Sequence, residues 1–204
     1  GQGALTNSTA DENCAFGDNC LLSNTTGTAN CAFGHDTMEQ NTTADNNVAF
    51  GHQAMKANTT GTNNAAFGMN ALTANQTGSE NVAIGRGALT SLTTNDGNVA
   101  IGRNAISSLT NGTANTAVGN KALEDNTAEH NTALGYHCLL QNTTGNSNTA
   151  IGSQAGDAIT TGTYNVAVGR AALGASTTGN YNVAVGRSLQ VSTGIGYNTG
   201  VGHD

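Results

Sequence analysis

The chain has 204 residues, of which 28 are Gly, none is Pro or Trp, and only 9% are charged. An average soluble domain is roughly 25% charged, so this composition is far from that of an ordinary globular enzyme. The formal net charge is −7 with only six basic residues, which argues against a nucleic-acid partner because such surfaces need clustered Lys and Arg. No apolar stretch approaches the ~20 residues that cross a bilayer, so we expect no membrane insertion.

A pentapeptide, Asn-x-Ala-apolar-Gly, recurs along the whole chain at steps of 17 residues, with two steps of 16. Its twelve copies start at Asn13, Asn30, Asn47, Asn64, Asn81, Asn98, Asn115, Asn131, Asn148, Asn165, Asn182 and Asn198. This spacing predicts one repeat domain over residues 1–204. Because the chain opens in mid-repeat without a start Met, we interpret it as a fragment of a longer fibre.

Each repeat predicts the same local structure when its Asn is numbered position 1. Alternation at positions 2 to 4 predicts a short strand, and the Gly at position 5 allows a turn with positive φ. Positions 8 and 9, usually Ala-Leu, add an apolar contact, and Asn-Thr-Thr-Gly at positions 12 to 15 is typical of a turn. Such a unit cannot bury its apolar face alone, but stacked units can.

We therefore expect an all-β parallel β-roll, or solenoid, of twelve coils. With neighbouring strands ~4.8 Å apart, the rod would be roughly 55–60 Å long. Each Asn at position 1 would lie above another Asn, where the amides can form a hydrogen-bonded ladder.

Apolar residues occur on both sides of the expected strand. Position 3 is Ala in every copy but the last, and position 4 is Phe in the first four copies and Ile, Val or Leu afterwards. One face can fill the roll, whereas the other needs a partner. We expect the small Ala column to permit close approach at a crowded symmetry axis, and the Phe residues to give a bulkier core at the N-terminal end.

Residues 81–85 and 98–102 both read Asn-Val-Ala-Ile-Gly, which resembles the head repeat of YadA-like trimeric autotransporter adhesins. Similar repeats occur in phage tail fibres and other bacterial trimeric fibre proteins. The resemblance covers nearly the whole chain, although the adhesin repeat is typically shorter. It implies a left-handed roll with three identical chains around a common axis, in a non-enzymatic extracellular fibre that extends from a cell or virion. The receptor, a cell-surface glycan or protein, is not identified by any motif.

The four cysteines occupy columns of small residues. Cys14 and Cys31 are at position 2, and Cys20 and Cys138 are at position 8. Their spacing matches no zinc site, so we expect buried free thiols, no metal and no other cofactor. A disulfide between Cys14 and Cys31, stacked one coil apart, is the alternative.

Position 6 is the most varied column, and stacking places His35 over His52 and Arg86 over Arg103. We expect a solvated surface there, with an anion or acidic-glycan contact or a His–metal site as alternatives. The carboxylates are scattered and none accompanies a nucleophile, so we expect no catalytic residue and no enzyme.

Three tyrosines near the C-terminal end, Tyr164, Tyr181 and Tyr197, each directly precede a repeat Asn. Aromatic rings beside polar groups are common at recognition surfaces. We therefore expect these tyrosines, with Arg170 and Arg187, to form a glycan-binding patch. The alternative is a stiffening ladder of stacked rings.

A monomeric solenoid such as an ice-binding protein is the alternative to the fibre. It would use Thr pairs at positions 14 and 16 that stack into a flat array. Asp45, Asp96 and Glu129 interrupt that array, so we favour the fibre. The supporting pairs are Thr26 and Thr28, Thr60 and Thr62, and Thr161 and Thr163.

Overall fold

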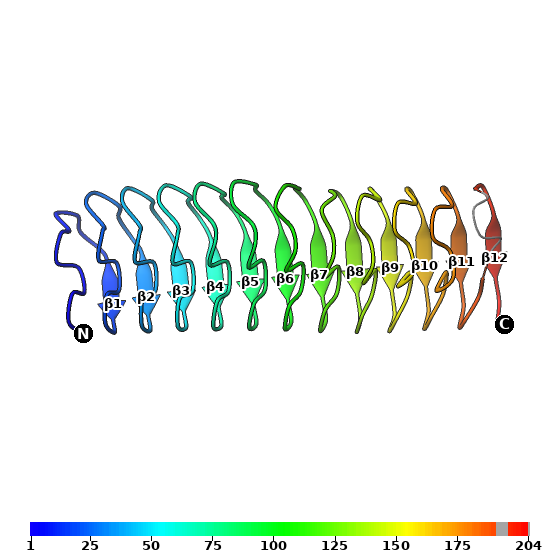
Figure 1. Ribbon diagram of the computed structural model, residues 1–204, viewed down its shortest axis with the longest axis horizontal. Helices are drawn as coiled ribbons and strands as arrows, with labels where there is room; N and C mark the ends of the chain where they lie inside the picture. Colours follow the sequence, from blue (N-terminus) through cyan, green and yellow to red (C-terminus); the bar gives the residue numbers. More distant parts are fainter. Residues whose placement is uncertain (191–195, 204) are drawn as a thin grey trace.

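The computed structural model describes residues 1–190 and 196–203, and this part of the chain is a straight all-β rod whose ends are the two termini (Figure 1). Twelve parallel strands, one per coil, form one sheet in chain order, with no helix in the described ranges. The predicted roll of stacked parallel coils is confirmed. The strands are β1 (Cys14–Phe16), β2 (Cys31–Phe33), β3 (Val48–Phe50), β4 (Ala65–Phe67), β5 (Val82–Ile84), β6 (Val99–Ile101), β7 (Thr116–Val118), β8 (Thr132–Leu134), β9 (Thr149–Ile151), β10 (Val166–Val168), β11 (Val183–Val185) and β12 (Thr199–Val201).

The strands pair in the same register as the repeats, so that Ala83 lies opposite Ala100 and Ile84 opposite Ile101. The Ala column faces inward and is buried within the chain's own coils from Ala32 to Ala184, while Ala15 in the first coil is half-buried. The expectation that this column lies at a symmetry axis is therefore wrong. Successive strand residues point to opposite faces, so positions 2 and 4 face outward.

The position-4 phenylalanines lie on the outer face and give the N-terminal end no bulkier core, contrary to expectation. Phe16 is 64% exposed and Phe50 is 36% exposed. The four rings stack along the rod with centroids 4.7–5.7 Å apart. They cannot turn inward because the narrow interior is already filled from the opposite wall of the coil.

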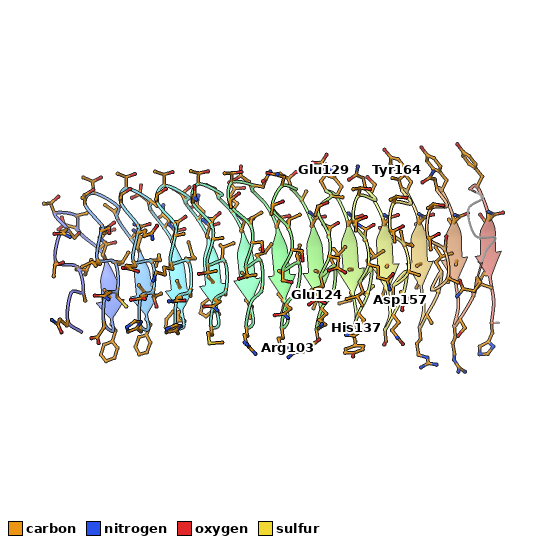
Figure 2. The ribbon with its side chains drawn as sticks, viewed as in Figure 1. Arg103, Glu124, Glu129, His137, Asp157 and Tyr164 are labelled. Carbon is orange, nitrogen blue, oxygen red and sulfur yellow. The ribbon has the colours of Figure 1, made fainter. Side chains whose placement is uncertain are left out.

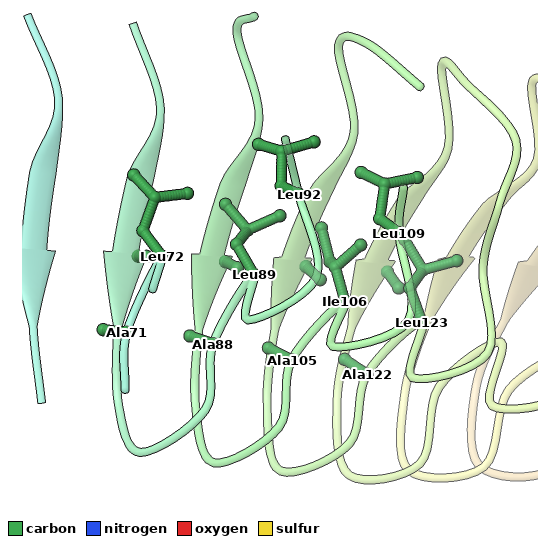
Figure 3. Packing of buried hydrophobic residues seen from close by; sticks show 14 of the residues in the cluster. Ala71, Leu72, Ala88, Leu89, Leu92, Ala105, Ile106, Leu109, Ala122 and Leu123 are labelled. Atoms are coloured by element: carbon green, nitrogen blue, oxygen red, sulfur yellow. The ribbon is translucent and has the colours of Figure 1, made fainter. Parts of the chain in front are cut away.

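That opposite wall is formed by positions 8 and 9, which supply the bulk of the core. Figure 3 shows Ala88 and Leu89 packed beside their equivalents in neighbouring coils. Leu89 is fully buried and has a left-handed backbone, with φ of 50°. Ten of the twelve coils, those that begin at Asn13 to Asn165, thus bury at least one large side chain against the small Ala of the strand, and the coil that begins at Asn81 buries both Leu89 and Leu92.

The Gly at position 5 is required by both backbone angle and space. Gly85 has φ of 125°, and a Cβ added there would lie 2.6 Å from the carbonyl oxygen of Gly102 in the next coil. Side chains other than hydrogen are excluded by both conditions. The predicted turn after each strand is confirmed.

The predicted ladder of position-1 Asn side chains is also confirmed, inside the rod. The Nδ2 of Asn64 donates to the Gly78 carbonyl of its own coil at 2.8 Å. Its Oδ1 accepts the backbone N–H of Asn81 at 2.9 Å. The ladder therefore ties each coil both to itself and to the next coil.

A second ladder, which sequence analysis missed, runs through the Asn residues at position 12. The Nδ2 of Asn58 donates to the Oδ1 of Asn41 and to the Gly61 carbonyl, both at 3.0 Å. The ladder stops where Leu92 follows Asn75, and the buried Oδ1 of Asn75 has no hydrogen-bond partner among the described residues. The recurring Asn of the Asn-Thr-Thr-Gly sequence could have indicated this second ladder, but we interpreted the sequence only as a turn.

Candidate functional site

Each coil bends at two edges, and these carry the exposed polar and aromatic side chains. We call positions 13 to 17 of the repeats, such as residues 160–164, the loop edge. We call positions 5 to 7, such as residues 102–104, the glycine edge. Figure 2 shows Glu129 and Tyr164 at the loop edge (top) and Arg103 and His137 at the glycine edge (bottom).

The three tyrosines that the sequence analysis assigned to a glycan-binding patch form a stacked ladder at the loop edge. The centroids of Tyr164 and Tyr181, and of Tyr181 and Tyr197, are 4.9 Å apart, with ring planes within 9° of parallel. The residues are nevertheless 52%, 45% and 82% exposed in chain order. Stacking covers the inner ring faces, while ring edges and hydroxyl groups remain accessible.

Arg170 and Arg187 do not join this ladder. They occupy position 6, the column of Arg103, and follow strands β10 and β11, whereas the tyrosines precede β10, β11 and β12. Both arginines are exposed, and neither forms an ion pair within the described residues. The structure therefore separates the predicted patch into a tyrosine ladder and an arginine column at opposite edges.

The stacked histidines at the glycine edge lie beside a small ion network. The rings of His35 and His52 are 5.4 Å apart, and His35 Nδ1 is 3.3 Å from the Asp36 carboxylate. A hydrogen bond from Lys56, at 2.9 Å, lowers the pKa of Asp36 to about 2. Lys56 also pairs with Glu39 at 3.0 Å. Across the described ranges, no three His, Cys, Asp or Glu side chains are grouped to hold a metal ion.

All four cysteines are free, so the alternative disulfide between Cys14 and Cys31 is not formed. Cys20 and Cys138 are buried as predicted, and burial raises the pKa of Cys138 to about 12. Cys14 is exposed and Cys31 half-buried, which corrects the expectation that all four are buried. Their position 2 faces outward, as position 4 does.

The outer face of the sheet is an apolar strip along the rod, which we define as positions 2 and 4 of all twelve strands. Every position 4 is Phe, Ile, Val or Leu, and position 2 is Val, Thr, Cys or Ala. No charged residue interrupts the strip. Ile84, in the middle of the rod, is 39% exposed.

The threonines of the loop edge are regular at position 14 in the first five coils, but not at position 16. Thr26, Thr43, Thr60, Thr77 and Thr94 are all exposed, one per coil. At position 16, the Thr28 hydroxyl donates to Asp45 at 3.1 Å. The acidic residues therefore break the second column, as the sequence indicates.

Comparisons with protein-family models, with curated proteins and with solved structures give no match for this chain. In residues 1–190 and 196–203, no helix has the length and apolar character needed to cross a bilayer.

Proposed function

We propose that this chain is a non-enzymatic module of a trimeric extracellular fibre, comparable to YadA-like adhesins and phage tail fibres, that attaches to a receptor on a target cell. The observation that carries the proposal is the exposed apolar strip. Soluble monomers rarely expose contiguous apolar patches larger than a few hundred Å². Here the strip has a member in every coil of the rod.

Identical chains are the best partners for this strip. Its side chains repeat with the strand spacing, so a second copy in the same axial register meets the same pattern coil for coil. Copies related by rotation close into a ring and leave no unpaired strip. The uncharged strip loses little by desolvation, since burial of a charge is the costly event.

This assembly would leave the loop edge directed outward for receptor binding. The tyrosine ladder at that edge offers ring edges and hydroxyl groups to a glycan or protein. Three copies per fibre multiply the avidity of a weak contact. A variant with Tyr164→Ala, Tyr181→Ala and Tyr197→Ala should keep its assembly and lose binding to target cells. Unchanged binding by this variant would assign the ladder to stiffening alone.

Mass in solution tests the assembly. Light scattering should give about three times the 20.4 kDa of one chain. Ile84→Glu with Ile101→Glu places charges in the strip and should release single chains. The matched control, Thr77→Glu with Thr94→Glu, adds the same charge at the exposed loop edge and should stay trimeric. A parent chain that is monomeric at micromolar concentration would refute the proposal.

Ice binding is the second candidate, because position 14 presents one exposed Thr per coil from Thr26 to Thr94. Regular Thr spacing on a flat surface would be required to match an ice lattice. The test is the thermal hysteresis of the parent chain and of a variant with Thr60→Leu and Thr77→Leu. Hysteresis in the parent that the variant loses would favour this function over the fibre.

A further inference from the structure

The loop edge contains a groove beside a coil that is one residue shorter than its neighbours. Within residues 13–181, which the structure describes throughout, no other coil is short. The step from Asn115 to Asn131 is 16 residues instead of 17. The turn after Asn126 has one Thr, Thr127, where the next coil has two, so the residue of position 14 is missing. The gap forms a cavity of about 360 Å³. Its lining includes Asn95, Asn111, Thr127, Glu129, Thr144 and Asn146.

Several polar groups of this groove are left free for a ligand. Among the described residues, no hydrogen bond engages the Asn111 amide, the Thr144 hydroxyl or the Nδ2 of Asn146. The Oδ1 of Asn146 accepts the backbone N–H of Glu129 at 3.1 Å, which fixes the amide in place. Glu129 Oε2 accepts the Thr113 hydroxyl at 3.3 Å, and its Oε1 remains free.

We propose that this groove is a subsite for a neutral saccharide. Amide and hydroxyl groups both donate and accept, as the hydroxyl groups of a sugar do, and Glu129 adds one strong acceptor. The volume lies at the lower end of the ~300–1,000 Å³ typical of small-molecule sites.

The charge of the lining residues favours a neutral saccharide over an anionic ligand and over Ca²⁺. Among the residues that the structure describes, Glu129 is the only charged one that lines the groove, so an acidic sugar or phosphate would meet a negative charge and no cation there. A Ca²⁺ ion takes six to eight oxygen ligands, commonly from several carboxylates. One carboxylate on an open groove does not meet that need.

Glu129, which lines the groove, and Tyr164, the first residue of the tyrosine ladder, lie on the same edge of the rod (Figure 2). The backbone N–H of Ser147 donates to the Glu129 carbonyl, and that of Tyr164 to the Asn146 carbonyl. Tyr164 is thus two coils from Glu129, which is ~10 Å at the strand spacing. A glycan held in the groove can reach the ladder. The groove is formed within a single chain, so the proposal does not depend on the trimer. It rests on the proposed function only because it takes a glycan as the receptor.

Saturation-transfer NMR with methyl β-galactoside, methyl α-mannoside and N-acetylglucosamine tests the groove. At least one of these sugars should bind the parent with a dissociation constant on the order of 1–10 mM. Insertion of one Thr after Thr127 restores the 17-residue coil and should abolish the signal by filling the gap. Glu129→Gln and Asn111→Ala, which leave the coil length unchanged, should each weaken binding roughly fivefold or more. Thr60→Ala, in a regular coil, is the control and should bind as the parent does.

Three results would overturn the proposal. They are no transfer from any of the three sugars, equal transfer in the insertion variant, and binding only of N-acetylneuraminic acid or only with added calcium. Light scattering on the same samples reports the trimer independently. A trimer without sugar binding refutes the groove alone, whereas sugar binding by single chains refutes the assembly alone.

Discussion

The Asn ladder of position 1 should contribute unequally to stability along the rod, and Asn98 is one of the members whose loss should cost the most. Asn98→Ala removes the Oδ1 that accepts the buried backbone N–H of Asn115 at 3.1 Å. It also removes the Nδ2 that donates to the Gly112 carbonyl at 3.0 Å. Leu109, not Asn, occupies position 12 of this coil, so Gly112 has no second donor among the described residues.

Asn64→Ala is the matched reference. It also orphans one backbone N–H, that of Asn81, but the Gly78 carbonyl keeps a second donor in Asn75 at 2.9 Å. A buried unsatisfied group costs about 1–3 kcal/mol. Two such groups predict a loss of about 2–6 kcal/mol for Asn98→Ala, and one group predicts about 1–3 kcal/mol for Asn64→Ala.

Urea unfolding at one fixed protein concentration measures both variants, since assembly adds to apparent stability. Hydrogen exchange of the Asn115 backbone N–H supplies a local measurement, because a solenoid can open coil by coil. Exchange should accelerate at Asn115 in the Asn98→Ala variant and stay slow in Asn64→Ala. The reasoning fails if the two variants lose equal stability, or if Asn115 remains protected in both.

Ala100→Leu should destabilise the rod by about 1–3 kcal/mol through overpacking of a fully buried site, whereas Thr94→Leu at the exposed loop edge should change the urea midpoint little. Because burial raises the pKa of Cys138 from 9.0 to about 12, its thiolate fraction at pH 8 is about 1,000-fold below that of an ordinary thiol. An alkylating reagent should therefore label the exposed Cys14 first, and equal labelling rates would contradict the buried placement. The Lys56 hydrogen bond lowers the pKa of Asp36 from 3.8 to about 2, so its stabilisation is complete above pH 4 and is lost as the pH falls through about 2. Lys56→Met should remove most of that acid-dependent part of the thermal midpoint, since Asn19 and Gln53 also donate to Asp36, while Lys121→Met should retain all of it.

The sequence alone determined the repeat, the parallel stack of coils, the turn at Gly85 and the ladder that contains Asn64. These features follow from local rules: two-residue alternation makes a strand, a Gly permits positive φ, and a fixed repeat length places like above like. The absence of disulfides among the four cysteines was also predicted correctly, although the prediction that they are buried was correct only for Cys20 and Cys138.

Only the tertiary structure decided which face of each strand is inside. Alternation cannot settle this when both faces are apolar, and the bulkier Phe16 column was therefore expected in the core. The closed coil leaves room for only a methyl group opposite Leu89, so the Ala column fills the interior and the larger residues face out. The same closure sends Tyr164 and Arg170 to opposite edges although they are close in the chain, because an extended strand separates its two ends. It also converts the single-residue deletion beside Thr127 into a groove, since the coils on either side hold their own positions through the position-1 ladder, in which Asn98 Oδ1 accepts the Asn115 N–H and Asn115 Oδ1 accepts the Asn131 N–H.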